Sequence, residues 1–198
     1  MNKELKTALD KPLGGLFLMT LLTVIWTIVG EISLKGEDFY VLGIIFILII
    51  LFFTSYYFKF YKRKKFLSKI HNQEDPKKEK LYRIILIAEG VAILVVQNIL
   101  ANINKDELFI PCFALIVGLH FFPLAKVFDR RFDYYIGTWT TSFALLGIYL
   151  TIRLSMYQYF INAIVCFACA TATTLYGLHM ISNANKIYAD DMQTNASR

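Results

Sequence analysis

Glu89 and His120 lie in stretches, IAEGVA and GLHFFPLAKVF, whose other residues are all apolar except Lys126. A carboxyl group and an imidazole placed side by side can share one proton near neutral pH, which suits proton coupling or contact with a polar ligand. If these stretches cross a membrane, each ionisable group costs at least about 2.5–3.5 kcal/mol near the centre and normally faces the bundle interior. Glu89 and His120 are therefore the first candidates for a ligand- or proton-binding site.

Each of these residues also has a purely structural interpretation. Glu89 can be neutral or bonded to a hydroxyl group, and His120 can donate to a backbone carbonyl. Pro123, which we predict to kink its helix, frees such a carbonyl because its ring prevents the helical hydrogen bond to residue 119. Thr138, expected at a similar depth, is a third candidate for the site, although hydroxyl groups in membrane helices more often bond their own backbone.

Glu31, Gln97 and Asn98 form a secondary group of candidates, expected nearer the opposite membrane surface. Asn98 follows Glu89 by nine residues, which places the two on opposite faces of an ideal helix, so their span must be contacted on two sides. For Glu31 a simpler interpretation is an ion pair with Lys35, one helical turn later.

The composition indicates the elements that must position these side chains. Apolar residues make up 57% of the 198 residues and charged residues 18%, whereas a soluble domain carries about 25% charge. Apolar runs recur that are long enough, at about 20 residues, to cross a hydrocarbon core of roughly 30 Å. Continuous runs such as VLGIIFILIILFF exclude the alternating pattern of a β-barrel. We predict an all-α bundle of six transmembrane helices forming one integral membrane domain, residues 1–198, with spans at about 13–34, 40–60, 82–103, 107–127, 133–153 and 158–181.

The basic residues predict the orientation of these spans. With the N-terminus in the cytoplasm, all but Lys35, Lys105 and Arg153 of the 21 basic residues fall on the cytoplasmic side, which is the bias that orients membrane helices. We therefore expect a multi-pass plasma-membrane protein with both termini inside. The second span, which carries almost nothing polar, is predicted to be the helix most exposed to lipid.

This orientation assigns Glu89 and His120 to one depth. Glu89 follows Arg83 by six residues and His120 precedes Lys126 by six, so each lies about 9 Å of helical rise into the membrane. The connector between their spans is short, which usually makes antiparallel neighbours. The two side chains can meet if the helices turn those faces toward each other.

The cytoplasmic connector 59–83 carries ten basic residues. Anionic lipid headgroups attract such a segment by about 1 kcal/mol per basic residue, and the alternative is that these residues only determine topology. No folded basic module is visible, so we expect no nucleic-acid partner. Pro76 is predicted to end any helical extension of the second span.

Cys112, Cys166 and Cys169 all lie within predicted spans, so the sequence implies no disulfide framework. Cys166 and Cys169 lack histidines at the same depth, and we interpret them as small packing residues, like the pair Ala168 and Ala172. We expect no metal site and no cofactor. The sequence contains no nucleophile elbow, zinc-protease helix or phosphate-binding glycine loop, so we do not expect an enzyme.

The segment GLHFFPLAKVF, followed by a basic turn, Tyr134-Tyr135 and a Gly-Thr step, resembles a pattern in small bacterial multi-pass membrane proteins. Those proteins carry a Gly-Leu-His-Phe-x-Pro-Leu-Ala segment and have no assigned activity. The resemblance covers residues 118–128 and, loosely, 134–138. It implies a six-helix bacterial membrane protein and singles out His120 and Pro123. In size and topology alone, the chain is also similar to the substrate-binding membrane components of vitamin uptake systems.

Two functional hypotheses follow from these residues. The first is a small-solute or proton binding and transport unit with Glu89 and His120 as its intramembrane polar site; its small-molecule ligand is unknown. The alternative is a non-catalytic scaffold, assembly factor or regulator whose polar residues only fix helix packing. In either case the lipid bilayer is the surrounding partner, and a homo-oligomer or a membrane-protein partner is compatible with the sequence.

Overall fold

A computed structural model describes residues 6–38, 40–67, 69–70, 75–154 and 157–196. Its long helices are α1 (Asp10–Leu34), α2 (Val41–Arg63), α3 (Pro76–Asn102), α4 (Phe109–Phe128), α5 (Arg131–Arg153) and α6 (Gln158–Ala196). The other elements of the described residues are short. They are two 3-10 helices, η1 (Lys64–Phe66) and η2 (Asp106–Leu108), and two strands, β1 (Lys6–Thr7) and β2 (Lys69–Ile70). The predicted all-α fold of six helices is confirmed.

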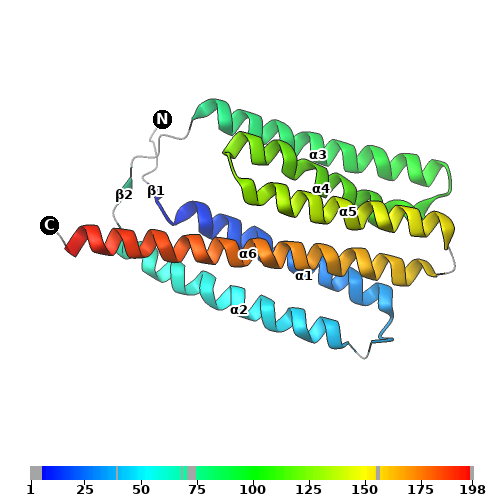
Figure 1. The fold of residues 1–198 in the computed structure, drawn as a ribbon, viewed down its shortest axis with the longest axis horizontal. Helices are drawn as coiled ribbons and strands as arrows, with labels where there is room; N and C mark the ends of the chain where they lie inside the picture. The colour runs from blue at the N-terminus through cyan, green and yellow to red at the C-terminus, as the bar shows by residue number, and fades with distance from the viewer. Residues whose placement is uncertain (1–5, 39, 68, 71–74, 155–156, 197–198) are drawn as a thin grey trace.

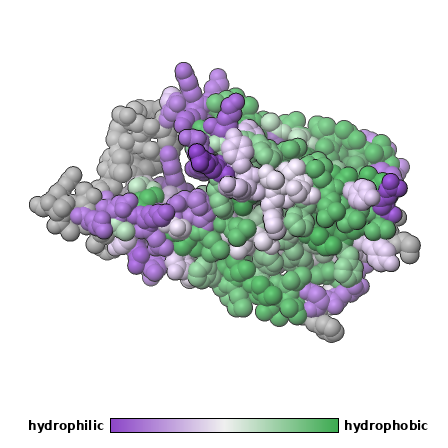
Figure 2. All heavy atoms as spheres, viewed as in Figure 1, coloured by the Kyte–Doolittle hydropathy of each residue, from purple (hydrophilic) through white to green (hydrophobic). Residues whose placement is uncertain are grey.

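All six helices are long and apolar enough to cross a membrane. Figure 2 shows the corresponding surface, on which apolar residues cover much of the bundle and hydrophilic residues gather toward its ends. The chain is therefore a multi-pass membrane protein.

The beginning of α3 corrects the prediction for Pro76. Helix α2 ends at Arg63, well before Pro76, and Pro76 is the first residue of α3. The carboxylate of Asp75 accepts a hydrogen bond from the backbone N–H of Lys77 at 2.9 Å, and proline is well suited to the first helical position because no N–H partner is needed there. Pro76 therefore starts a helix rather than ending one.

Helix α6 is the centre of the bundle. It packs most extensively against α1 and also contacts α5, α4 and α2. Figure 1 shows it crossing α1, with α5 on one side and α2 on the other. Helix α3 lies at the edge, packed against α4. In an 18-residue apolar window of each helix, 6% of the residues are buried in α3 and 17% in α2. The prediction that the second span is the most lipid-exposed is therefore wrong, because exposure depends on the number of neighbouring helices and not on the number of polar residues.

Close packing of α1 and α6 depends on small side chains. A Cβ atom at Gly30 would lie 3.0 Å from the ring of Phe167, so the helices approach closely at this point. The hydroxyl groups of Thr23 and Thr173 are 2.7 Å apart across the interface. Cysteines 166 and 169 are buried in the core, and Ala168 and Ala172 are buried on the same helix. Their predicted burial as packing residues is confirmed.

Helices α4 and α5 form an antiparallel hairpin through the two-residue connector 129–130. A Cβ atom at Gly118 would lie 2.6 Å from Oγ1 of Thr141. On the other helix, a Cβ atom at Gly137 would lie 3.1 Å from the carbonyl oxygen of Gly118. This close approach fixes the rotation of α4, and so determines where His120 points.

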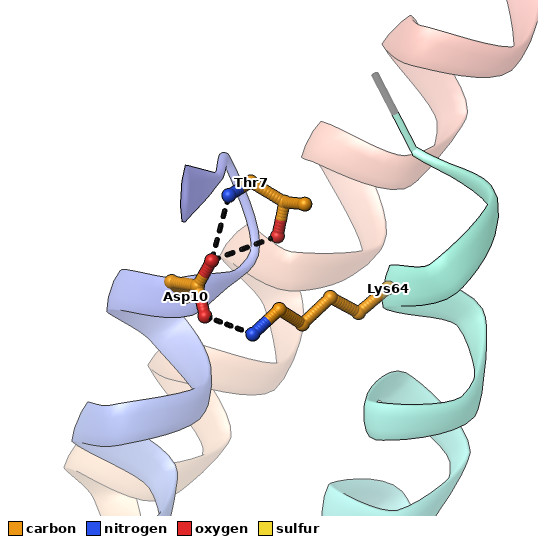
Figure 3. Close-up of polar contacts among 3 residues, drawn as sticks. All are labelled: Thr7, Asp10 and Lys64. Carbon is orange, nitrogen blue, oxygen red and sulfur yellow. Dashed lines mark hydrogen bonds and ion pairs between the residues drawn. The ribbon is translucent and has the colours of Figure 1, made fainter. Parts of the chain in front are cut away.

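The strands β1 and β2 pair in antiparallel fashion at one end of the bundle, near the end of α6 (Figure 1). At this end Asp10 accepts hydrogen bonds from Thr7 and pairs with the ammonium group of Lys64, which links the start of α1 to the segment that follows α2 (Figure 3). With 39 residues α6 is about 58 Å long. It continues well past residue 181, where the predicted span ended, and exceeds the roughly 30 Å of a hydrocarbon core.

Candidate functional site

Glu89 and His120 face each other between α3 and α4. Nδ1 of His120 lies 3.2 Å from Oε1 of Glu89, and their side chains are 14% and 16% exposed, respectively. The two atoms are within ion-pair distance, but Nδ1 has no well-aligned hydrogen bond among the described residues. This geometry agrees with the expectation that the two side chains can meet, which rested on their matched depth and on the short connector between their helices.

The pair lies in an open groove of about 300 Å³, which we name the α3–α4 groove. The remainder of its lining is apolar: Ile85, Ala88, Ala92, Ile116, Leu119 and Pro123. A groove of this volume is at the lower end of the range of small-molecule sites. A carboxyl oxygen and an imidazole nitrogen are therefore held together inside an apolar lining, where they can bind a proton or a polar group.

The structural interpretation of His120 depended on Pro123. Helix α4 continues through Pro123 without a break, and the proline side chain lines the groove. No hydrogen bond from His120 to a backbone carbonyl occurs among the described residues; its ring is stacked on that of Phe121 with centroids 4.4 Å apart. The geometry therefore places His120 beside the carboxyl group of Glu89.

Thr138 does not belong to this site. Its residue is exposed and does not line the α3–α4 groove. Helix α5 buries Gly137, Thr140 and Ala144, and Thr138 lies outside that face because a helix turns about 100° per residue. The prediction rested on depth alone, which does not specify the face of the helix on which Thr138 lies.

The secondary group of Glu31, Gln97 and Asn98 is not assembled. Gln97 and Asn98 are exposed on α3, and the amide of Asn98 donates to the carbonyl oxygen of Leu94 at 2.7 Å. Glu31 lies on α1 against α2, where a Cβ atom on Gly43 would be 2.8 Å from its Oε1. These residues were predicted to share a depth, but α3 packs at the far edge of the bundle from α2 (Figure 1).

The predicted ion pair between Glu31 and Lys35 does not form in the structure. The ammonium group of Lys35 lies 3.6 Å from the centre of the Tyr159 ring, a cation–π contact. Lys35 has a left-handed backbone conformation at the end of α1, and no ion pair with Glu31 is found in the described part of the chain. The backbone N–H of Lys35 still bonds the carbonyl oxygen of Glu31 at 3.0 Å, but the left-handed conformation turns the Lys35 side chain away from the direction that a helical residue would have.

A second polar cluster was missed by the sequence reasoning. Asp133 is 2% exposed, and its Oδ1 accepts a hydrogen bond of 2.7 Å from the hydroxyl group of Tyr176. The guanidinium group of Arg130 donates to the same hydroxyl oxygen at 3.3 Å. His179 stacks on Phe132 with centroids 4.4 Å apart. This cluster joins the start of α5 to α6.

One aromatic ring lies between the two polar sites. Phe121 stacks on His120, and its ring centroid is 6.0 Å from that of Tyr176. The signal in the sequence was an acidic residue, Asp133, at the first turn of a span and two residues after the pair Arg130-Arg131. It was missed because the predicted span began at residue 133, which made the acid look like a boundary residue.

Comparison of the chain with protein-family models, with curated proteins and with solved structures found no match in any of the three.

Proposed function

We propose that this membrane protein is a binding unit for a small solute or a proton, with the Glu89–His120 pair as its intramembrane site and transport as the activity that binding serves. The observation that carries the proposal is the 3.2 Å separation of Nδ1 and Oε1 inside the α3–α4 groove. Two ionisable groups at membrane depth are costly, which is why such residues generally have a function.

The chemistry of the pair supports this function. A carboxyl and an imidazole in contact provide one acceptor and one donor together with a single exchangeable proton. The groove leaves these atoms close to the outside of the bundle, because Leu119 in its lining is 49% exposed. A ligand can therefore approach the pair without separation of the packed helices α1, α5 and α6.

Proton flux in liposomes tests the proposal. Purified protein is reconstituted with a pH-sensitive dye inside the vesicles, and a potassium diffusion potential drives protons inward. We expect flux above that of empty vesicles for the unmodified chain and a loss of at least about tenfold for Glu89→Gln, because an amide cannot exchange the proton. Uptake of a panel of small solutes is measured on the same vesicles.

The matched control is Gln97→Leu, which also removes a polar side chain from α3 but lies outside the groove. This control should retain the full flux. Equal proton flux and equal solute uptake in the unmodified chain and in Glu89→Gln would refute the role of the pair.

A second candidate function, a membrane scaffold or regulatory partner, is favoured by the exposed position of α3. That helix packs against α4 and leaves most of its apolar surface uncovered, as expected of a helix that contacts another protein or a second copy. If this is the role, Glu89→Gln and His120→Ala should both lower the melting temperature in detergent strongly while leaving flux unchanged.

We also propose that the end of the bundle carrying the connector 59–83 faces the cytoplasm, where its cations contact anionic lipid. The support is the charge bias, since the connector 59–83 carries ten basic residues, whereas the opposite side is expected to carry Lys35, Lys105 and Arg153. Lys80 in this connector and Lys105 in the opposite one are both exposed. Lys80→Cys should react with a membrane-impermeant maleimide in inverted vesicles and Lys105→Cys in intact cells. The reverse pattern would overturn the orientation.

A further inference from the structure

The polar atoms of the α3–α4 groove are few and lie close together. Six apolar residues surround one carboxyl and one imidazole group, whose nearest atoms are 3.2 Å apart. The groove extends along α3 from Ile85 to Ala92, about 10 Å of helical rise. It therefore has room for one small polar group and a short length of a narrow apolar chain.

The groove opens on the side of the bundle that faces lipid. Ala88, Leu119 and Pro123 in its lining are exposed, and α3 as a whole is the least buried of the six helices. Glu89 lies six residues beyond Arg83, which is about 9 Å of rise from a residue expected at the headgroup level. A molecule that enters from the bilayer thus meets the pair at a depth where its chain is already in hydrocarbon.

The charge of the pair selects the ligand. With one shared proton the pair has no net charge, whichever atom holds that proton. An anionic ligand would add a second negative charge beside Glu89 unless a further proton were taken up. A cationic ligand would require the loss of the shared proton. Net charge beside lipid is costly, so an uncharged ligand is the one that leaves the protonation of the pair unchanged.

A hydroxyl group fits both members of the pair. It can donate to the carboxyl oxygen of Glu89 and accept from the ring N–H of His120, whose Nδ1 has no aligned partner among the described residues. An ether or an alkyl end could not do both. A phosphate is excluded by charge at this depth.

We propose that the α3–α4 groove binds an uncharged, hydroxyl-bearing amphiphile of the long-chain alcohol class, which enters from the bilayer and places its hydroxyl group between Glu89 and His120. This inference rests on the proposed function, because it names the ligand class of the same site. It concerns binding and requires no chemical step.

Photolabelling with a matched set of probes tests the ligand class. The probes share one alkyl chain with a diazirine and a terminal alkyne, and they end in a hydroxyl, a methyl ether, an amine or a carboxylic acid. The protein is held in nanodiscs of uncharged phospholipid, and labelled peptides are located by mass spectrometry. We expect the alcohol to label α3 and α4 at the groove about fivefold or more above the ether, the ratio that one net hydrogen bond supplies.

Three variants connect the labelling to the site. Glu89→Leu removes the carboxyl group and should reduce labelling by the alcohol to the level of the ether. Ala92→Phe fills the groove without altering the polar pair, and should reduce labelling by every probe. Gln97→Leu, on the same helix but outside the groove, should label like the unmodified chain. Should Glu89→Leu fail to fold, Ala92→Phe and the comparison of probes still decide the question.

The remaining outcomes separate the inference from the proposed function. Preferential labelling of the groove by the acid or the amine would overturn the alcohol class and leave the binding unit intact. Labelling by all probes that is equal at the groove and unaffected by Ala92→Phe would overturn the inference, whereas the proposed function is decided separately by the proton flux and solute uptake of Glu89→Gln. Labelling that disappears as the ratio of protein to lipid rises would assign the groove to a second copy of the chain, and would also overturn the inference.

Discussion

The contact between Asp133 and Tyr176 predicts a measurable coupling energy between α5 and α6. Tyr176→Phe removes one hydroxyl group and retains the ring that packs beside Phe121 and Phe132. The carboxyl group of Asp133, which is 2% exposed, then loses its donor at 2.7 Å. An unsatisfied buried group costs about 1–3 kcal/mol, so we expect Tyr176→Phe to lower the free energy of unfolding by about 2 kcal/mol.

The coupling follows from a double-mutant cycle with Asp133→Ala. Hydrogen bonds between membrane helices average about 0.6 kcal/mol and reach about 1.7 kcal/mol, and a bond to a carboxylate lies at the strong end of the range. We therefore expect a coupling of about 1.5 kcal/mol, with the double variant less destabilised than the sum of the two single variants. Asp133→Asn is the control, because its amide oxygen can still accept from Tyr176.

These free energies are measured by unfolding the protein in bicelles, either by steric trapping or by titration with a denaturing detergent. The control Asp133→Asn should lose less stability than Asp133→Ala. Tyr176→Phe should cost more in the Asp133→Asn background, which keeps an acceptor for the hydroxyl group, than in the Asp133→Ala background, which does not. A coupling below about 0.3 kcal/mol, the level at which independent sites are simply additive, would refute the role assigned to this hydrogen bond.

Two further predictions concern stability. Gly118→Ala should destabilise the protein by about 1–3 kcal/mol through overpacking, because its Cβ atom would lie 2.6 Å from Oγ1 of Thr141. Its control is Gly90→Ala, which should not destabilise because a Cβ atom there would have nothing within 4 Å. Thermal unfolding of both variants in one detergent compares them, and equal melting temperatures would contradict the close approach of α4 and α5. Lys64→Met should lower the free energy of unfolding by up to about 1 kcal/mol, because it removes the partly exposed ion pair with Asp10. Its control is Lys65→Met, at an exposed residue, and a larger loss of stability in the control would exclude a specific role for the ion pair.

The contact between Glu89 and His120 was predictable from the sequence as a possibility, because positions along neighbouring helices can be compared residue by residue. Their distances from Arg83 and Lys126 along the chain gave each a height, and the short connector made their helices neighbours. The structure describes those helices as antiparallel, with the two side chains in contact. Whether the contact serves binding stays a prediction.

The direction in which a side chain points around its helix was not predictable in the same way. Thr138 and Asn98 were chosen as candidates by their expected depth, but both are exposed. Hydrophobic periodicity normally reveals the buried face of a helix. In a membrane both lipid-facing and buried residues are apolar, so this signal is weak. Asp133 was missed for a related reason, because its partner Tyr176 lies 43 residues away on a helix whose face could not be predicted.

The most extensive helix contact of the bundle, between α1 and α6, joins the earliest of the six helices along the chain with the latest of the six. Thr23 therefore enters the bilayer long before Thr173 exists, and its hydroxyl group has the carbonyl oxygen of Met19, 2.8 Å away, as an acceptor during that interval. Contacts between segments so distant in the chain form late, because the intervening chain must be ordered first. Biosynthesis thus leaves the bundle open until the final helix is inserted, and a chain truncated before α6 would expose the face of α1 that buries Trp26 and Gly30 to quality-control proteases.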